Sequence, residues 1–289
     1  MWEGMTMNNI LLVDGMALLF RGFYATSFRK NFMENRHGIP TNGIFQYMRY
    51  LFHAIDKFQP THIVCCWDMG KETFRTELYD DYKANRQEPP KELIPQFDLV
   101  KDVMNAYNIP NVGMKNYEAD DCIGTLAETY KENHLVTILS GDQDFRQLVD
   151  KNVQLALMLR GQGNYRLYTN ENFYDRLEVT PNQIIDMKAL MGDSADNYPG
   201  VKGIGEKTAL KLIKKYGTID RLLENLSDLT KTMQMRITNN LEMLHLSKQL
   251  ATIKRNVPLH VPLENAIFQY DEQQVYNRLY QLSLEHVIV

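Results

Sequence analysis

Short apolar runs alternate with helical periodicity along the first two thirds of the chain. Runs rich in Val, Ile and Leu occur at residues 10–13, 62–67, 135–140 and 153–159, and such runs are typical of buried parallel strands. The segments 41–58, 95–107 and 119–133 between them have helical periodicity. Strands that alternate with helices predict an α/β domain with a mainly parallel central sheet flanked by helices.

Two regions depart from this alternation. Residues 71–91 are polar, carry charges of both signs and end near Pro89-Pro90, which is typical of a functional loop or lid; a solvated loop without function is the alternative. Beyond Thr180-Pro181, a helix start, helical patterns dominate, and the tail after Lys254 is irregular and expected to pack on the body. We predict an α/β domain at 8–180 and a helical subdomain at 181–289.

Acidic side chains gather where the predicted strands end. Asp14 follows the first strand, Asp68 the second, and Asp142 with Asp144 the third. Ligands of parallel sheets bind beyond the carboxyl ends of the strands. Further acids stand in the motifs YEADD and MGDSADNYPG. Together the nine candidate metal ligands are Asp14, Asp68, Glu118, Asp120, Asp121, Asp142, Asp144, Asp193 and Asp196.

Gathering so many carboxylates in one pocket is costly unless multivalent cations neutralise them. Oxygen ligands, without the Cys or His spacing of a zinc site, favour Mg²⁺ or Mn²⁺. Helix capping explains one or two acids near residue 118, but three within four residues exceed that need. An Asx-turn is the alternative for Asp142 and Asp144. The acids therefore predict a metal-dependent enzyme that acts on phosphates.

Composition narrows the class of protein further. The chain is 44% apolar and 24% charged, as in soluble globular proteins. It has neither a signal peptide pattern nor an apolar run near the roughly 20 residues of a membrane helix. Its three cysteines, Cys65, Cys66 and Cys122, indicate reduced thiols in a cytoplasmic protein. The formal charge of −4 becomes +5 when the nine acids, each counted as −1, are set aside, so a polyanionic partner is permitted.

A glycine- and lysine-rich segment at 198–217 indicates such a partner. Its glycines permit a tight turn and close approach to phosphate, helix N-terminal amides bind anions, and lysines at intervals of four extend a phosphate track. This segment looks like a helix–hairpin–helix that holds DNA backbone without reading sequence; a packing hairpin with a solvated lysine face is the alternative. The candidate DNA-binding residues here are Gly203, Gly205, Lys207, Thr208, Lys211 and Lys215.

The motifs VDG, WD, FRTELYDDYKANR, EADD, GDQD and GDSADNYPGVKGIGEKTA, taken in order, resemble the 5′-nuclease (flap endonuclease) family. The resemblance extends from about residue 8 to about residue 256 and is greatest to the bacterial branch. That branch includes the N-terminal domain of DNA polymerase I and stand-alone members, and we expect a stand-alone member. The resemblance implies a PIN-like sheet, a helical arch at about 71–92 and the hairpin subdomain.

The resemblance also implies the cofactors. Two divalent cations, Mg²⁺ or Mn²⁺, are expected, the first around Asp14, Asp68, Glu118 and Asp120. The second is expected near Asp121, Asp142, Asp144, Asp193 and Asp196, with Asp120 between the two. A potassium ion at the hairpin is expected on backbone carbonyls of Leu190, Met191, Pro199, Val201 and Ile204.

The implied activity is that of a 5′-3′ exonuclease and flap endonuclease, which hydrolyses DNA phosphodiesters near junctions by a two-metal mechanism in replication and repair. Lys83, Arg86 and, as a third candidate, Arg75 are expected to act on the phosphate, and Arg21 and Tyr82 to contact DNA. Substrates would be 5′ flaps, nicked or branched duplexes and RNA-primed segments. We expect a monomer associated with the bacterial nucleoid. A catalytically weak branched-DNA-binding protein and a PIN-like ribonuclease are the alternatives.

Overall fold

The computed structural model describes residues 7–28 and 32–288, and its centre is a sheet of strand order β3-β2-β1-β4-β5-β6. Neighbouring strands from β3 to β5 pair in parallel, and β6 pairs antiparallel with β5. The predicted α/β fold with a mainly parallel sheet is confirmed. The strands are β1 (Asn9–Asp14), β2 (His62–Cys66), β3 (Asn111–Val112), β4 (Leu135–Ser140), β5 (Val153–Met158) and β6 (Tyr165–Tyr168).

Both faces of the sheet are buried under helices. In β1, Ile10 and Leu12 belong to the core on the side of α5, whereas Leu11 and Val13 belong to the core beneath α1, α2 and α4. This alternation follows from the two-residue period of a strand, and each buried side chain contributes roughly 1.5–3 kcal/mol. The helices are α1 (Gly15–Thr26), α2 (Asn42–Phe58), α4 (Gln96–Ala106) and α5 (Ala119–Tyr130).

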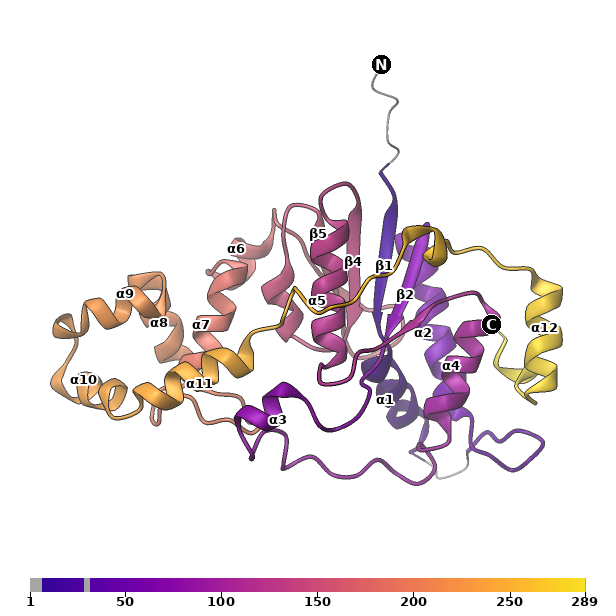
Figure 1. The fold of residues 1–289 in the computed structure, drawn as a ribbon, viewed down its shortest axis with the longest axis horizontal. Helices are drawn as coiled ribbons and strands as arrows, with labels where there is room; N and C mark the ends of the chain where they lie inside the picture. Colours follow the sequence, from indigo (N-terminus) through magenta and orange to yellow (C-terminus); the bar gives the residue numbers. More distant parts are fainter. Residues whose placement is uncertain (1–6, 29–31, 289) are drawn as a thin grey trace, which may run out of the picture.

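A helical region lies to one side of the sheet (Figure 1). It begins with α7, where Thr180 and Gln183 form a capping box before Pro181 at the first turn, as the sequence predicts. Helix α11 packs against α7. The region comprises α7 (Pro181–Met191), α8 (Glu206–Tyr216), α9 (Ile219–Glu224), α10 (Lys231–Thr238) and α11 (Leu241–Ala251), and α6 (Phe173–Leu177) precedes it. Short 3₁₀ helices are η1 (Asp144–Leu148), η2 (Leu226–Asp228), η3 (Leu263–Ala266) and η4 (Glu285–Val287).

The tail after α11 crosses the sheet to reach α12 (Glu272–Gln281) on the far side (Figure 1). On the way, the amide of Phe268 donates to the carbonyl of Thr61 at 2.9 Å. The tail packs on the body as predicted, but the expectation of an irregular tail is wrong. Helix α12 escaped prediction because only Val275 and Leu279 are buried in a polar segment.

The polar insertion, here called the arch segment (residues 71–92), forms the short helix α3 (Phe74–Leu78) followed by turns. It lies beyond the carboxyl ends of the strands, next to the helical region (Figure 1). The amide of Lys83 donates to the carbonyl of Asp196 at 2.9 Å, and Asn197 donates to the carbonyl of Asp81 at 2.7 Å. The arch segment therefore joins the two parts of the molecule.

Among the described residues, no helix combines the length and apolar character that a membrane crossing requires.

Candidate metal centre

Hydrogen bonds fix the first acids at the carboxyl edge of the sheet. Asp14, the last residue of β1, caps α1 by accepting from the Ala17 amide at 3.0 Å. The Ser140 hydroxyl at the end of β4 donates to Asp14 at 2.6 Å and accepts from the Asp142 amide at 2.9 Å. Adjacent parallel strands thus place Asp14 and Asp142 side by side.

Two more acids approach the same edge from β2 and α5. Asp68 accepts from the Ala119 amide, the first residue of α5, at 2.7 Å. Burial raises the pKa of Asp68, and burial with the negative charges of Asp142 and Asp14 raises that of Asp120 well above its usual value. Burial, opposed by the hydrogen bond from Ser140, raises the pKa of Asp14 to about 7. Carboxyls in this state disfavour their charged form unless a cation is near, so this all-oxygen donor set fits a divalent cation.

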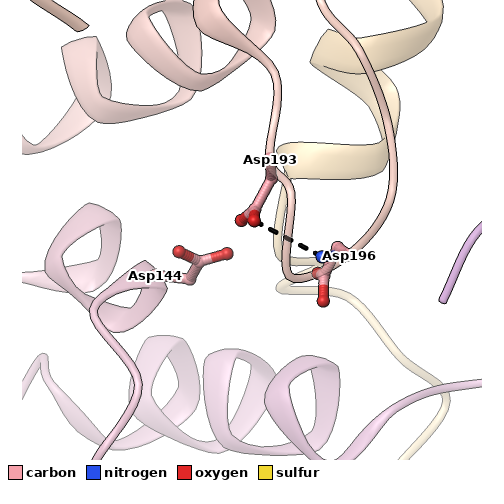
Figure 2. A group of neighbouring side chains, drawn as sticks. All are labelled: Asp144, Asp193 and Asp196. Carbon is pink, nitrogen blue, oxygen red and sulfur yellow. Dashed lines mark hydrogen bonds between the residues drawn. The ribbon is translucent and has the colours of Figure 1, made fainter. Parts of the chain in front are cut away.

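A second acidic group consists of Asp144, Asp193 and Asp196. One oxygen of each lies within 4.8 Å of the others, an arrangement suited to a metal ion. Asp144 opens η1 beside the sheet, whereas Asp193 and Asp196 follow α7 of the helical region. Figure 2 shows the carboxylates of Asp144 and Asp193 pointing toward one another from different ribbons. Burial and the charge of Asp142 raise the pKa of Asp144 to about 6.

Lys188 of α7 lies between these acids and was not predicted. Its ammonium forms ion pairs with Asp144 and, at 2.5 Å, with Asp193. Burial alone would lower the pKa of Lys188, but the two carboxylates raise it above its usual value. The available signal was a lone lysine on the apolar face of a helix, five residues before Asp193.

The arch segment contributes cations to the acids at the carboxyl edge of the sheet, here called the acidic edge. Glu118 accepts from the Lys83 ammonium at 2.5 Å and from the Tyr82 hydroxyl at 3.2 Å. Asp196 accepts from Arg86 at 2.8 Å. Lys83 and Arg86 therefore lie among the predicted metal ligands, and their action on a phosphate stays a prediction.

Three predicted site residues lie elsewhere or are already engaged. Asp121 is fully buried, and both of its oxygens accept from Arg75, at 2.7 and 2.9 Å. Asp121 and Arg75 therefore satisfy each other in this structure, an arrangement that does not favour the predicted roles of Asp121 as a metal ligand and of Arg75 as a phosphate contact. The roughly 100° rotation per helical residue that separates Asp121 from Asp120 turns Asp121 inward. Tyr82 is buried, and its hydroxyl oxygen lies 3.2 Å from a carboxylate oxygen of Glu118 and 3.1 Å from one of Asp196, an arrangement that does not favour its predicted contact with DNA.

The predicted DNA-binding hairpin forms between α7 and α8. Gly203 has a φ of +86°, a conformation that favours glycine, and Gly205 caps α8 with open space beside its Cα. Along α8, Lys207, Lys211 and Lys215 are exposed, and Thr208 is half-buried. Arg236 of α10, which was not predicted, donates to the Gly203 carbonyl at 3.2 Å.

Arg21, the other predicted DNA contact, is half-buried and held by the end of β5. It donates to the carbonyl of Met158 at 3.3 Å and also to that of Leu159. Its guanidinium lies near Gly141 at the acidic edge, so its contact with DNA stays a prediction.

Four of the five predicted potassium residues line an open hollow of about 720 Å³ beside the hairpin. Its lining includes Met191, Pro199, Val201 and Ile204. The carbonyl of the fifth, Leu190, accepts from the Val201 amide at 2.8 Å. A potassium ion at these carbonyls stays a prediction.

Carboxylates at the carboxyl edge of a parallel sheet, a cationic arch and a helical hairpin define a metal-dependent nuclease with an α/β fold. Two family models match: "5′-3′ exonuclease, N-terminal resolvase-like domain" at residues 9–178 and "5′-3′ exonuclease, C-terminal SAM fold" at residues 179–274. The chain belongs to the 5′-3′ exonuclease family. The prediction of a 5′-3′ exonuclease acting on DNA is confirmed.

Similar proteins agree with this assignment. A Bacillus subtilis 5′-3′ exonuclease is 54% identical over 95% of this chain and 93% of its own length. DNA polymerase I of Lactococcus lactis subsp. cremoris is 40% identical over 91% of this chain, which spans 30% of that polymerase. A bacteriophage T5 flap endonuclease variant, in complex with DNA and metal ions, superimposes with a TM-score of 0.66 at 25% identity, covering 84% of this chain and 88% of the T5 chain.

Proposed function

We propose that this exonuclease cleaves DNA at 5′ ends and at 5′ flaps near junctions, with two divalent cations, Mg²⁺ or Mn²⁺, as cofactors. The observation that carries the proposal is the meeting of acids from the sheet and from the helical region, at Asp144, Asp193 and Asp196. The similarity to a T5 flap endonuclease variant, described with DNA and metal ions, supports the choice of substrate and cofactor.

Eight carboxylates would hold the cations. Buried acids with raised pKa values, such as Asp14 and Asp144, fit a cation because it would stabilise their charged form. When bound, the cations supply Lewis acidity and neutralise developing negative charge. We assign Asp14, Asp68, Glu118 and Asp120 to one cation, and Asp142, Asp144, Asp193 and Asp196 to the other.

Basic side chains beside the acids would bind the scissile phosphate. Lys83, Arg86 and Lys188 each pair with one or more of these carboxylates, so a phosphate arriving at this edge meets three positive charges. Hydrolysis would leave a 5′-phosphate and a 3′-hydroxyl. The cysteines are poor nucleophiles, since burial raises the pKa of Cys65, Cys66 and Cys122 above the usual value of a thiol.

The hairpin would hold the duplex part of the substrate. Gly203 and Gly205 allow the backbone to approach a phosphate, and the exposed lysines of α8 extend the contact without reading sequence. A potassium ion on the carbonyls of Leu190, Met191, Pro199, Val201 and Ile204 would add positive charge there. The arch segment would admit the single-stranded 5′ end. We also predict that the protein is a cytoplasmic monomer associated with the nucleoid.

A cleavage assay with 5′-labelled substrates tests this proposal. The chain is incubated with Mg²⁺ and a 5′ flap, a nicked duplex or single-stranded RNA, with EDTA as the control. We expect cleavage of the flap at the junction, lost in EDTA. Binding of the flap without cleavage would favour a branched-DNA-binding protein, and cleavage confined to RNA would favour a PIN-like ribonuclease.

A further inference from the structure

Arg75 is a buried arginine whose guanidinium joins three separate segments. Its Nε donates to the carbonyl of Leu250 at 2.9 Å, and Nη2 donates to that of Thr252 at 2.8 Å. Nη1 and Nη2 also donate to Asp121. The side chain is 2% exposed, so the arch segment, the start of α5 and the end of α11 meet at one cation.

The same guanidinium reaches an acid of the metal centre. Nη1 of Arg75 donates to Oε2 of Glu118 at 3.2 Å. Asp121 reinforces this contact because it also accepts from the Glu118 amide, at 3.1 Å, and from the Lys254 amide, at 2.8 Å. Glu118 is thus fixed by its backbone and its side chain, and the fixing group is anchored in the helical region.

We propose that Arg75 is a positioning residue that holds Glu118 in place and fastens the end of α11 to the acidic edge. Through it, the part of the molecule that carries the hairpin keeps a defined position relative to the acids. Planar geometry with five donors suits Arg for this role, whereas Lys offers one ammonium. The inference rests on the proposed function in one respect, that Glu118 ligates a divalent cation.

The test compares Arg75→Lys with the wild-type chain in three measurements: Mn²⁺ binding followed by electron paramagnetic resonance, single-turnover flap cleavage, and flap affinity in Ca²⁺. We expect Mn²⁺ binding and the cleavage rate each to weaken about tenfold or more, as for other groups that orient metal ligands, while flap affinity stays within about threefold. Arg255→Lys is the matched control. Arg255 is half-buried and donates to the Gln147 carbonyl at 2.7 Å without touching an acid of the metal centre.

The proposal would be overturned if Arg75→Lys bound Mn²⁺ and cleaved the flap within about twofold of the wild type. It would also be overturned if Arg255→Lys, at the same unfolding temperature as Arg75→Lys, lost Mn²⁺ binding and cleavage to the same extent. If Arg75→Lys does not fold, Asp121→Asn replaces it, because that variant keeps the shape of the partner and weakens the hold on Arg75. The same weakening of Mn²⁺ binding is then expected, and unchanged binding overturns the proposal. A wild-type chain that binds Mn²⁺ but cleaves no flap contradicts the proposed function, and the Mn²⁺ titration still decides the role of Arg75.

Discussion

The ammonium of Lys188 lies 2.5 Å from a carboxylate oxygen of Asp193 and also pairs with Asp144. A side-chain cation therefore stands between acids of the sheet and of the helical region. Because a divalent cation at these acids would meet the positive charge of Lys188, the two charges repel. In the proposed function, Lys188 would thus weaken the binding of a metal ion while offering its charge to a phosphate.

Lys188→Met is therefore expected to change metal binding and catalysis in opposite directions. Two charges about 4 Å apart interact by up to about 4 kcal/mol near a protein surface, so Mn²⁺ binding should tighten several-fold or more. The single-turnover cleavage rate should fall by about tenfold or more, because a positive charge at the phosphate is lost. Titration with Mn²⁺ and flap cleavage measure the two effects. Lys131→Met, which removes a lysine paired with Asp150, should change neither; weaker Mn²⁺ binding in Lys188→Met would contradict this account.

The stability of the metal-free chain should depend on pH through Asp14. Burial raises the pKa of its carboxyl in the folded state to about 7, against the ordinary value of 3.8. Between these pH values the folded state holds a proton that the unfolded state has released, so stability falls as pH rises. In EDTA, the wild type should lose on the order of a few kcal/mol of unfolding free energy relative to Asp14→Asn as pH rises from 5 to 8. Denaturant unfolding at several pH values measures this difference, and parallel pH profiles would rule the effect out.

Lys83→Ala should slow the chemical step more than it weakens binding. The ammonium of Lys83 bonds to Glu118 at the acidic edge, so the loss is confined to the reacting end of the substrate. We expect the single-turnover rate to fall about a hundredfold and flap affinity to change less than about fivefold. Lys71→Ala is the control in the same segment, since Lys71 is exposed and pairs with Glu88. An unchanged rate in Lys83→Ala would refute its role.

Lys207 and Lys211 should contribute to duplex affinity and not to chemistry. Both are exposed on α8, and replacing both with Ala should weaken binding of a nicked duplex about tenfold. The slope of log affinity against log salt concentration should fall by the equivalent of about two phosphate contacts. The rate at saturating DNA should stay within about twofold. Lys151→Ala, at an exposed turn before β5, is the control. A salt dependence equal to that of the wild type would contradict the predicted phosphate contacts.

Apolar runs and strand-end acids were enough to predict the parallel sheet and the location of the acidic edge. Strand β6 and helix α12 were not predicted because few of their own residues are apolar and buried; α12 buries only Val275 and Leu279. The direction of the Asp121 side chain was not predicted either, because a cluster of acids does not reveal which one an arginine 46 residues away will bind. Lys188 escaped for a similar reason, since its partners Asp144 and Asp193 meet only in the folded chain.

We propose that acids from the sheet and from the helical region form one catalytic metal centre. Single-turnover cleavage of a 5′-labelled flap by Asp144→Asn, in Mg²⁺, tests it most directly, because Asp144 is the sheet-side member of the group with Asp193 and Asp196. We expect a rate at least about a hundredfold below that of the wild type, with flap affinity in Ca²⁺ within several-fold of the wild-type value. A rate within about threefold of the wild type, at equal flap affinity, would contradict it.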